Sequence, residues 1–431
     1  MQAIKPDDKL FIKNRQKLYS LLKPGSLAIL NSNDEMMRNG DQYFPFRQNS
    51  DLYYLTGINQ EKTQLILCKD KNEKTRAFLF IREPNPKLET WEGRKLRKEE
   101  AMAISGIDEI RFSNDFFEFA RDKAFQYEYI YVNLVENPKK QDEYHNMDQR
   151  VFRQMQNIFP LHGFERLAPL LEQLRLRKEP EEIKIMQEAI TITGNAFQRV
   201  LNILKPGIKE HEIEAELTHE FIKSGARGHA YPPIVASGEN ACYLHYIKNS
   251  GSCDEGDLLL LDFGAELSNY AADLSRTIPV NGKYTQRQKD LYLACLDVFY
   301  HARDLMAPGI TINEINEQVG KYWEEKHISL NLYPRDKTSA PDGTPMWKKY
   351  YPHGTSHYLG LDVHDVGKKN IPLAPGMVLS CEPGIYIPDE AIGIRIENDI
   401  LITETGYRDL MENIPLTPGE IEEIMQTKTN R

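Results

Sequence analysis

An internal repeat in the second half of the chain constrains its fold more than any other feature. The segment Leu204–Ile208 (LKPGI) recurs as Met306–Ile310 (MAPGI). A Glu-Ile pair follows each copy and begins at Glu212 and Glu314. The offset is the same for both features (309 − 207 = 102 and 314 − 212 = 102). In each copy a helix is expected to end at Pro-Gly and a second helix to begin soon after. The sequence therefore predicts two related helical halves.

A second pair of segments repeats in the same order. Gly256–Gly264 (GDLLLLDFG) matches Gly376–Gly384 (GMVLSCEPG) at an offset of 120 (376 − 256 = 120). Each has the pattern of a turn, an apolar strand, an acidic residue and a turn glycine. The two matches together predict a duplicated α+β domain, in which each half has helices followed by a strand that ends in a carboxylate.

The first of these carboxylates is expected to face a second one across a hairpin. Burying a carboxylate costs several kcal/mol unless a cation or another group compensates its charge. Asp262 ends the apolar run, and Asp273 follows a polar stretch that could form a turn. A turn centred on Leu267–Ser268 would place the two acids directly opposite, with Cβ atoms about 5 Å apart. Two like charges this close repel each other unless a cation lies between them.

The second half repeats this arrangement. Glu382 precedes a predicted turn at Pro388-Asp389-Glu390, and Glu397 lies on the returning strand. A turn centred on 389–390 sets these two glutamates opposite each other. The two hairpins together would bring four carboxylates into one cluster.

Three histidines lie between the hairpins in the sequence, at His353, His357 and His364. Glycines among them argue against a continuous helix. Imidazole together with carboxylates suits zinc, iron, cobalt or manganese, and a majority of oxygen ligands favours manganese or magnesium. The acids and histidines therefore predict a metal site.

The first part of the chain has a different pattern, in which strands and helices alternate. Helical patterns cover Leu10–Leu22 and Asp115–Ala124, and this alternation is typical of an α/β domain. We predict an N-terminal domain over residues 1–172 and a catalytic domain over 173–431. The predicted strands are Ser26–Leu30, Gln64–Cys68, Ala77–Ile81 and Tyr129–Val132.

Composition narrows the possible environment and partners. The formal net charge of −10 argues against a nucleic-acid binder. The sequence contains no run of about 18 apolar residues, so no membrane span is predicted. The first 20 residues lack the apolar core of a signal peptide. The five cysteines include no C-x-x-C pair, which favours a reducing compartment. We therefore expect a cytoplasmic protein that binds neither nucleic acid nor membranes.

These motifs together resemble the aminopeptidase P and prolidase branch of the creatinase and methionine aminopeptidase superfamily. In the first part, Phe46–Gly57 resembles the N-terminal domain of aminopeptidase P. The resemblance implies a pita-bread fold with pseudo-twofold halves for the second domain. The segments that carry it there are Leu244–Tyr246, Asp262–Gly264, Asp273–Thr277, His353–Asp365, Glu382–Gly384 and Arg395–Asp399.

The resemblance also implies two divalent metal ions, usually manganese, with zinc, cobalt or iron as alternatives. Asp262 would hold one ion, and Asp273 and Glu397 would bridge both. His357 and Glu382 would complete the coordination of the other ion. Relatives of this kind are often dimers or tetramers, so a homo-oligomer is expected.

Further residues match the substrate site of the family. His245, His353 and His364 match positions that line this site and help to stabilise the transition state. Arg395 matches a residue beside the bridging glutamate, and Tyr386 matches another position that lines the site.

The activity implied is release of the first residue from peptides with proline in second position, through attack by a hydroxide that bridges the two ions. Glu382 would carry the proton from this nucleophile to the leaving nitrogen. A prolidase, which cleaves only Xaa-Pro dipeptides, and a non-catalytic binding protein on the same fold are the alternatives. The polar segment Asn331–Lys349 does not fit the family pattern, and both a lid and a subunit contact are open for it.

Overall fold

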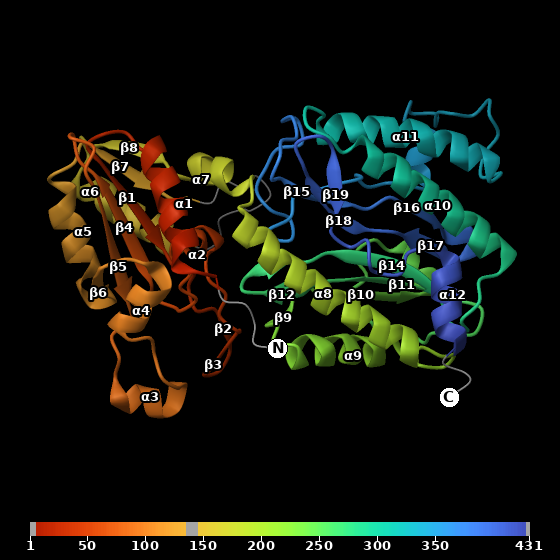
Figure 1. The fold of residues 1–431 in the computed structure, drawn as a ribbon, viewed down its shortest axis with the longest axis horizontal. Coiled ribbons are helices and arrows are strands. Elements are labelled where there is room, and N and C mark those ends of the chain that lie inside the picture. Colours follow the sequence, from red (N-terminus) through yellow and green to blue (C-terminus); the bar gives the residue numbers. More distant parts are fainter. Residues whose placement is uncertain (1–5, 135–144, 428–431) are drawn as a thin grey trace. The chain divides into compact units, whose positions relative to one another are not determined.

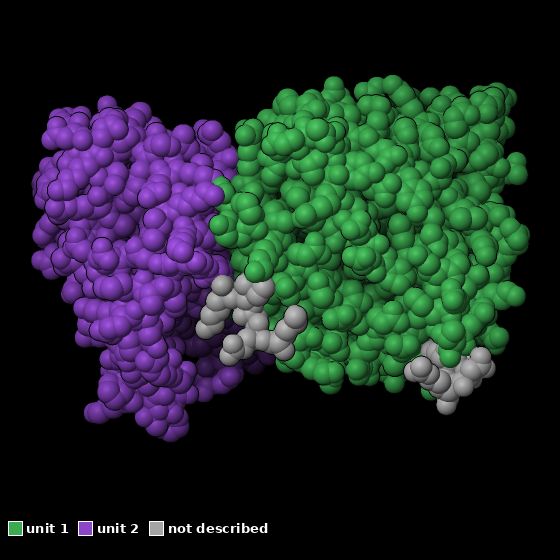
Figure 2. All heavy atoms as spheres, viewed as in Figure 1, with its two compact units in different colours: residues 1–5, 176–431 green, residues 6–175 purple. Residues whose placement is uncertain are grey.

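The computed structural model describes residues 6–134 and 145–427. The chain divides into two compact units, Pro6–Arg175 and Leu176–Arg431 (Figure 2). The boundary between them lies three residues after the predicted one. Each unit has its own sheets and helices, and no helix in the described parts is long and apolar enough to span a membrane.

The N-terminal unit is built on a mixed six-stranded sheet with the order β6-β5-β4-β1-β7-β8. All four predicted strands are present, and the two that were missed are short and incompletely buried, so they lack a continuous apolar run. The central strand β1 pairs antiparallel with β4 and parallel with β7. The strands are β1 (Ser26–Asn31), β4 (Gln64–Lys69), β5 (Thr75–Ile81), β6 (Glu109–Phe112), β7 (Tyr129–Val132) and β8 (Gly163–Arg166).

Helices accompany this sheet, and the two that were predicted are observed within two residues of their expected starts. Apolar side chains from the strands and from α5 and α6 form one buried cluster, which includes Ile29, Phe80 and Met155. A small hairpin, β2 (Met37–Asn39) and β3 (Gln42–Tyr43), is exposed. The helices are α1 (Asp8–Leu21), α2 (Ser50–Thr56), α3 (Pro86–Glu92), α4 (Lys98–Ser105), α5 (Phe116–Ala124), α6 (Met147–Ile158) and α7 (Ala168–Arg175).

The C-terminal unit shows the predicted duplication. In Figure 1, α8 (Pro180–Ile203) and α9 (Glu210–Lys223) lie on one side of the strands, and α10 (Gln286–Leu305) and α11 (Ile312–Ser329) lie on the other. A last helix, α12 (Pro418–Thr427), follows the strands.

Backbone hydrogen bonds confirm that the two halves are related. The N–H of Gly207 donates to the carbonyl of Cys253 over 2.8 Å, and the N–H of Gly309 donates to that of Leu373 over 2.9 Å. Donors and acceptors differ by the same offsets of 102 and 120 that the sequence shows (309 − 207 and 373 − 253). Both glycines have positive φ values, +88° and +98°, which a residue without Cβ adopts at no steric cost.

Each half contributes a three-stranded sheet, with orders β10-β11-β14 and β15-β18-β19. A bridge between Ser275 and Glu397 joins the halves, and the N–H of Glu397 donates to the carbonyl of Ser275 over 3.1 Å. The strands are β9 (Gly228–His229), β10 (Ile234–Ser237), β11 (Leu258–Phe263), β12 (Ala265–Leu267), β13 (Tyr270–Ala271), β14 (Leu274–Pro279), β15 (Val378–Cys381), β16 (Gly384–Ile387), β17 (Ile392–Arg395), β18 (Asn398–Ile402) and β19 (Tyr407–Asp409).

The segment 331–349 packs beside α11. A Cβ atom on Gly320 of α11 would lie 2.5 Å from the Trp347 ring, so the indole rests directly on the helix backbone. Arg335 forms a 2.8 Å ion pair with Glu325 of the same helix. The segment therefore contacts α11 at two points, Arg335 and Trp347.

Candidate metal centre and substrate pocket

The first hairpin carries its two acids in a different register from the predicted one. The turn lies at Ser268 and Asn269, which both have positive φ, so Asp262 faces Ser275 rather than Asp273. The expectation of directly opposed acids was wrong by two positions. Because a shift of two residues preserves the face of a strand, Asp273 still lies diagonally next to Asp262.

The second hairpin has the predicted register. Ile387 pairs with Ile392 around the turn, and Cys381 pairs with Asn398 beyond it. Glu382 and Glu397 lie between these two ladders. The turn is a short 3₁₀ helix, Pro388–Glu390, as its Pro-Asp-Glu sequence favours.

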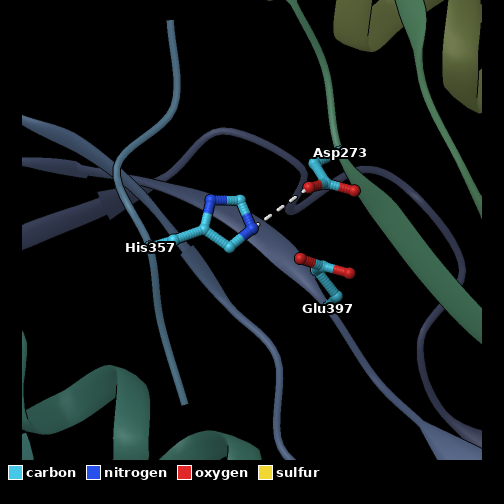
Figure 3. A group of neighbouring side chains, drawn as sticks. All are labelled: Asp273, His357 and Glu397. Carbon is cyan, nitrogen blue, oxygen red and sulfur yellow. Dashed lines mark ion pairs between the residues drawn. The ribbon is translucent and has the colours of Figure 1, made fainter. Parts of the chain in front are cut away.

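The two hairpins and a histidine bring metal-ligand atoms together (Figure 3). One atom each from Asp273, His357 and Glu397 lie within 4.8 Å of one another. His357 Nε2 is 3.4 Å from Asp273 Oδ2 and 3.5 Å from Glu382 Oε1. The other ring nitrogen, Nδ1, lies 3.0 Å from the carbonyl of Tyr358, which fixes a proton there and leaves Nε2 to face the acids.

The acids of this cluster, Asp273, Glu382 and Glu397, have raised pKa values, because burial and mutual repulsion disfavour their charged forms. Burial alone would lower the pKa of His357, but its hydrogen bond to Asp273 and the charge of Glu382 raise it to about 9. A divalent cation among these acids would compensate their charges and favour the ionised carboxylates.

Arg395 fixes the geometry of the acids from behind. This arginine is 4% exposed and donates to Asp262 Oδ2 over 2.6 Å, to Ser275 Oγ over 3.0 Å and to the Tyr386 hydroxyl over 2.8 Å. The Ser275 hydroxyl in turn donates to Glu397 Oε2 over 2.7 Å. One guanidinium thus connects acids from both halves.

Tyr231 is the functional residue that the sequence did not reveal. Its hydroxyl contacts Asp262 Oδ1 at 2.6 Å and also contacts Asp273 Oδ1. Burial and the charges of the two acids raise its pKa well above 10.0, so the hydroxyl stays protonated. No motif or spacing marks this tyrosine, because it reaches the acids only through the fold.

We predict that Tyr231→Phe weakens metal binding without unfolding the protein. Loss of a hydrogen bond that orients a metal ligand typically lowers affinity about 10- to 100-fold. Competition with a fluorescent chelator measures the change, and Tyr243→Phe on the exposed surface is the matched control. Equal metal affinity in the wild type, Tyr231→Phe and Tyr243→Phe would contradict the role given to the Tyr231 hydroxyl.

A second prediction concerns the close approach of the two strands of the first hairpin. A Cβ atom at Gly264 would lie 1.7 Å from the carbonyl oxygen of Ala272. Gly264→Ala is therefore expected to destabilise the protein by about 3 kcal/mol or more and to displace the neighbouring acids. Gly406→Ala, which meets no atom within 4 Å, is the control in denaturant unfolding. Equal stability of the two variants would contradict the prediction.

The acids form one wall of a cavity of about 240 Å³. Of the ten predicted site residues, nine line it, and Tyr386 lies behind His353 instead. Polar groups together with apolar side chains are typical of a substrate pocket. The apolar lining is formed by Pro232, Ile234, Leu244, Ile247 and Val363. Of these, only Leu244 and Val363 belong to segments that the sequence analysis singled out.

Two histidines of the pocket, His353 and His364, have lowered pKa values and are neutral at pH 7. Burial and the charge of Arg395 lower the pKa of His353 to about 3, and burial and His357 lower that of His364 to about 4. Both ring nitrogens of His353 are engaged, Nδ1 with the Gly354 carbonyl and Nε2 with the Tyr386 hydroxyl, each at 2.8 Å. His364 stacks edge-on against His357 at 4.4 Å between ring centroids.

Comparisons with known proteins agree with this architecture. The family model of metallopeptidase family M24 matches residues 184–404, and that of the aminopeptidase P N-terminal domain matches residues 11–131. The chain is 35% identical to the Xaa-Pro aminopeptidase of Escherichia coli, over 96% of this chain and 97% of that protein.

Two solved structures of E. coli aminopeptidase P are also similar. The complex with the inhibitor Pro-Leu superposes with a TM-score of 0.90 at 34% identity, covering 99% of this chain and 100% of the other. A zinc-substituted form with product gives 0.89 at 33% identity and covers 99% of each chain. The chain therefore belongs to metallopeptidase family M24 and carries the N-terminal domain of aminopeptidase P.

Proposed function

We propose that this protein is a metal-dependent aminopeptidase that releases the N-terminal residue from peptides with proline in second position. The observation that carries the proposal is the convergence of the acids and His357 on a cavity that apolar side chains also line. Relatives named Xaa-Pro aminopeptidase and the E. coli complex with Pro-Leu support the choice of substrate.

The donor set fits two divalent ions, for which we propose Mn²⁺, with zinc, cobalt or iron as alternatives. Asp262 would contact one ion, and His357 and Glu382 the other. Asp273 would contact both, since its Oδ1 meets Tyr231 beside Asp262 and its Oδ2 lies 3.4 Å from His357 Nε2, and Glu397 would be shared in the same way. Such ions, when bound, polarise a carbonyl and lower the pKa of water toward 7.

The remaining residues would handle protons and developing charge. The half-buried Glu382 has a raised pKa, which suits a group that takes a proton from the attacking water and returns it to the leaving nitrogen. Neutral His364 would donate a hydrogen bond to the scissile carbonyl. His353 has no free ring nitrogen, so it would act by shaping the pocket and by holding Tyr386 against Arg395.

Recognition of proline would depend on shape. The nitrogen of an Xaa-Pro bond carries no hydrogen, so a protein cannot select it through that donor. His245, with the apolar side chains Ile234 and Leu244, would form the wall against the pyrrolidine ring.

We also propose a cytoplasmic homo-oligomer. All five cysteines are free, which fits a reducing compartment. Large apolar side chains are exposed on the hairpin β2–β3 and on α3, including Met37 at 65% and Trp91 at 88%. Light scattering on protein eluting from a size-exclusion column should give the mass of a dimer or tetramer. A monomer at micromolar concentration would refute the proposed homo-oligomer.

The proposed activity is tested by comparing three peptides, Xaa-Pro-Yaa, Xaa-Ala-Yaa and Xaa-Pro, with manganese-loaded protein. Release of the first residue from Xaa-Pro-Yaa alone is the expected result. Cleavage of the dipeptide alone would identify a prolidase instead, and no cleavage of any peptide would favour a binding protein.

A further inference from the structure

Glu210, the first residue of α9, is a fully buried carboxylate outside the metal cluster. Its Oε1 accepts from the Ser237 N–H and from Asn240 Nδ2, each over 2.9 Å. Its Oε2 accepts from the Tyr246 hydroxyl over 2.7 Å and from the Gly251 N–H over 2.6 Å. Among the described residues it has no ion pair with a lysine or arginine. Its charge is therefore balanced by four donors and by the N-terminus of the helix.

Two of these donors, the Tyr246 hydroxyl and the Gly251 N–H, belong to the segment 243–251, which carries His245. Residues 243–251 form no helix or strand, so side-chain contacts rather than a ladder determine their conformation. The Tyr246 hydroxyl also contacts Asn240 Nδ2 at 3.1 Å and accepts from the Ser250 N–H over 3.3 Å. Leu244, His245 and Ile247 of this segment line the cavity.

The acid is not part of the repeated scaffold. The offset of 102 relates Glu210 to Ile312 (312 − 210 = 102), at the same first position of α11 in the second half. An isoleucine cannot accept a hydrogen bond, so the carboxylate serves a feature that only the first half has. That feature is the segment with His245.

We infer that Glu210 is a positioning residue, which fixes the conformation of the loop 243–251 and thereby holds His245 at the cavity wall. The inference rests on the proposed function, in which His245 forms part of the wall for proline. Glu210 itself does not line the cavity, so any effect on catalysis passes through the loop.

The hydrogen-bond pattern makes glutamine an unsuitable replacement although its shape is the same. Asn240 and Tyr246 can reorient and become acceptors, but a backbone N–H cannot. One backbone N–H faces each carboxylate oxygen, that of Ser237 on one side and that of Gly251 on the other. The NH2 group of a glutamine would therefore face a backbone N–H in either orientation of the amide, and two donors cannot form a hydrogen bond.

A double-mutant cycle in the full-length, manganese-loaded protein tests the inference. Glu210→Gln is expected to raise KM and to lower kcat/KM for Xaa-Pro-Yaa roughly 10-fold, but less than about 2-fold when His245 is already alanine. The control is Glu212→Gln on the same helix, where the carboxylate accepts the Lys209 N–H over 2.7 Å at the surface and an amide oxygen can replace it. Tyr246→Phe removes one of the four donors to Glu210, together with the acceptor of the Ser250 N–H. It should show the same coupling at smaller size if Glu210→Gln folds poorly.

Hydrogen exchange supplies a readout that does not depend on activity. Amides of residues 243–251 should exchange faster in Glu210→Gln than in the wild type or in Glu212→Gln. Unchanged exchange in this loop, or an equal loss of kcat/KM with and without His245, overturns the inference. A wild type that does not cleave Xaa-Pro-Yaa would refute the proposed function instead, and the exchange measurement would then decide about Glu210 by itself.

Discussion

Asp273→Asn is expected to abolish peptidase activity and to remove bound metal in the same step. Asp273 is 4% exposed, and its carboxylate lies between Tyr231, His357 and Glu397. An uncharged amide of the same size cannot contact two cations as a carboxylate does. The loss of several kcal/mol of transition-state stabilisation corresponds to a decrease in kcat/KM of roughly 10³-fold or more.

Metal content by mass spectrometry and kcat/KM for Xaa-Pro-Yaa measure this effect in parallel. Asp389→Asn in the exposed hairpin turn is the matched control and should retain both. If Asp273→Asn kept wild-type activity while losing one ion, the carboxylate would not be shared between two ions.

The second large effect concerns acid stability and depends on His327. This residue is fully buried, and in the part of the chain that the structure describes neither ring nitrogen has a hydrogen-bond partner. The ring stacks on Trp323 and meets the edges of Tyr333 and Tyr350. Burial lowers the pKa of His327 from 6.5 to about 3.

The sign of the pH effect follows from this pKa. The unfolded chain takes up a proton below pH 6.5, whereas the folded protein takes it up only near pH 3. Stability is therefore complete above pH 6.5 and is lost as the pH falls toward 3, by up to about 5 kcal/mol in total. Between pH 7 and pH 5 the loss attributable to His327 is about 2 kcal/mol, or roughly 4–8 °C in melting temperature.

His327→Phe keeps the stacked ring and removes both nitrogens. We expect this variant to be at least as stable as the wild type at pH 7, because it removes two buried ring nitrogens that have no hydrogen-bond partner among the described residues. Its melting temperature should fall less steeply between pH 7 and pH 5, with chelator in both samples so that metal release does not contribute. Parallel melting curves for the two proteins would show that His327 does not titrate in this way.

The sequence predicted those parts of the fold that depend on local pattern. Continuous apolar runs located the long strands of the N-terminal sheet, whereas β6 and β8 are short and partly exposed and gave no such signal. The duplication was visible because Pro-Gly turns and strand-terminating acids recur at fixed offsets. The register of the second hairpin followed from a turn that its sequence defines well.

The rest depended on tertiary structure. The first hairpin was misplaced because Ser268 and Asn269 both adopt left-handed backbone conformations, which shifts the turn by one residue. Tyr231 reaches the acids from a segment without any motif. The engagement of both nitrogens of His353 depends on the orientation of Tyr386, which no sequence pattern encodes.

The most direct test of the two-metal account is a titration of metal-free protein with Mn²⁺. Calorimetry measures the ions bound, and cleavage of Xaa-Pro-Yaa measures the activity at each step of the titration. The account predicts two equivalents bound per chain, with full activity only after the second, and no activity in excess chelator. Full activity with one equivalent, or cleavage that persists in chelator, would contradict it.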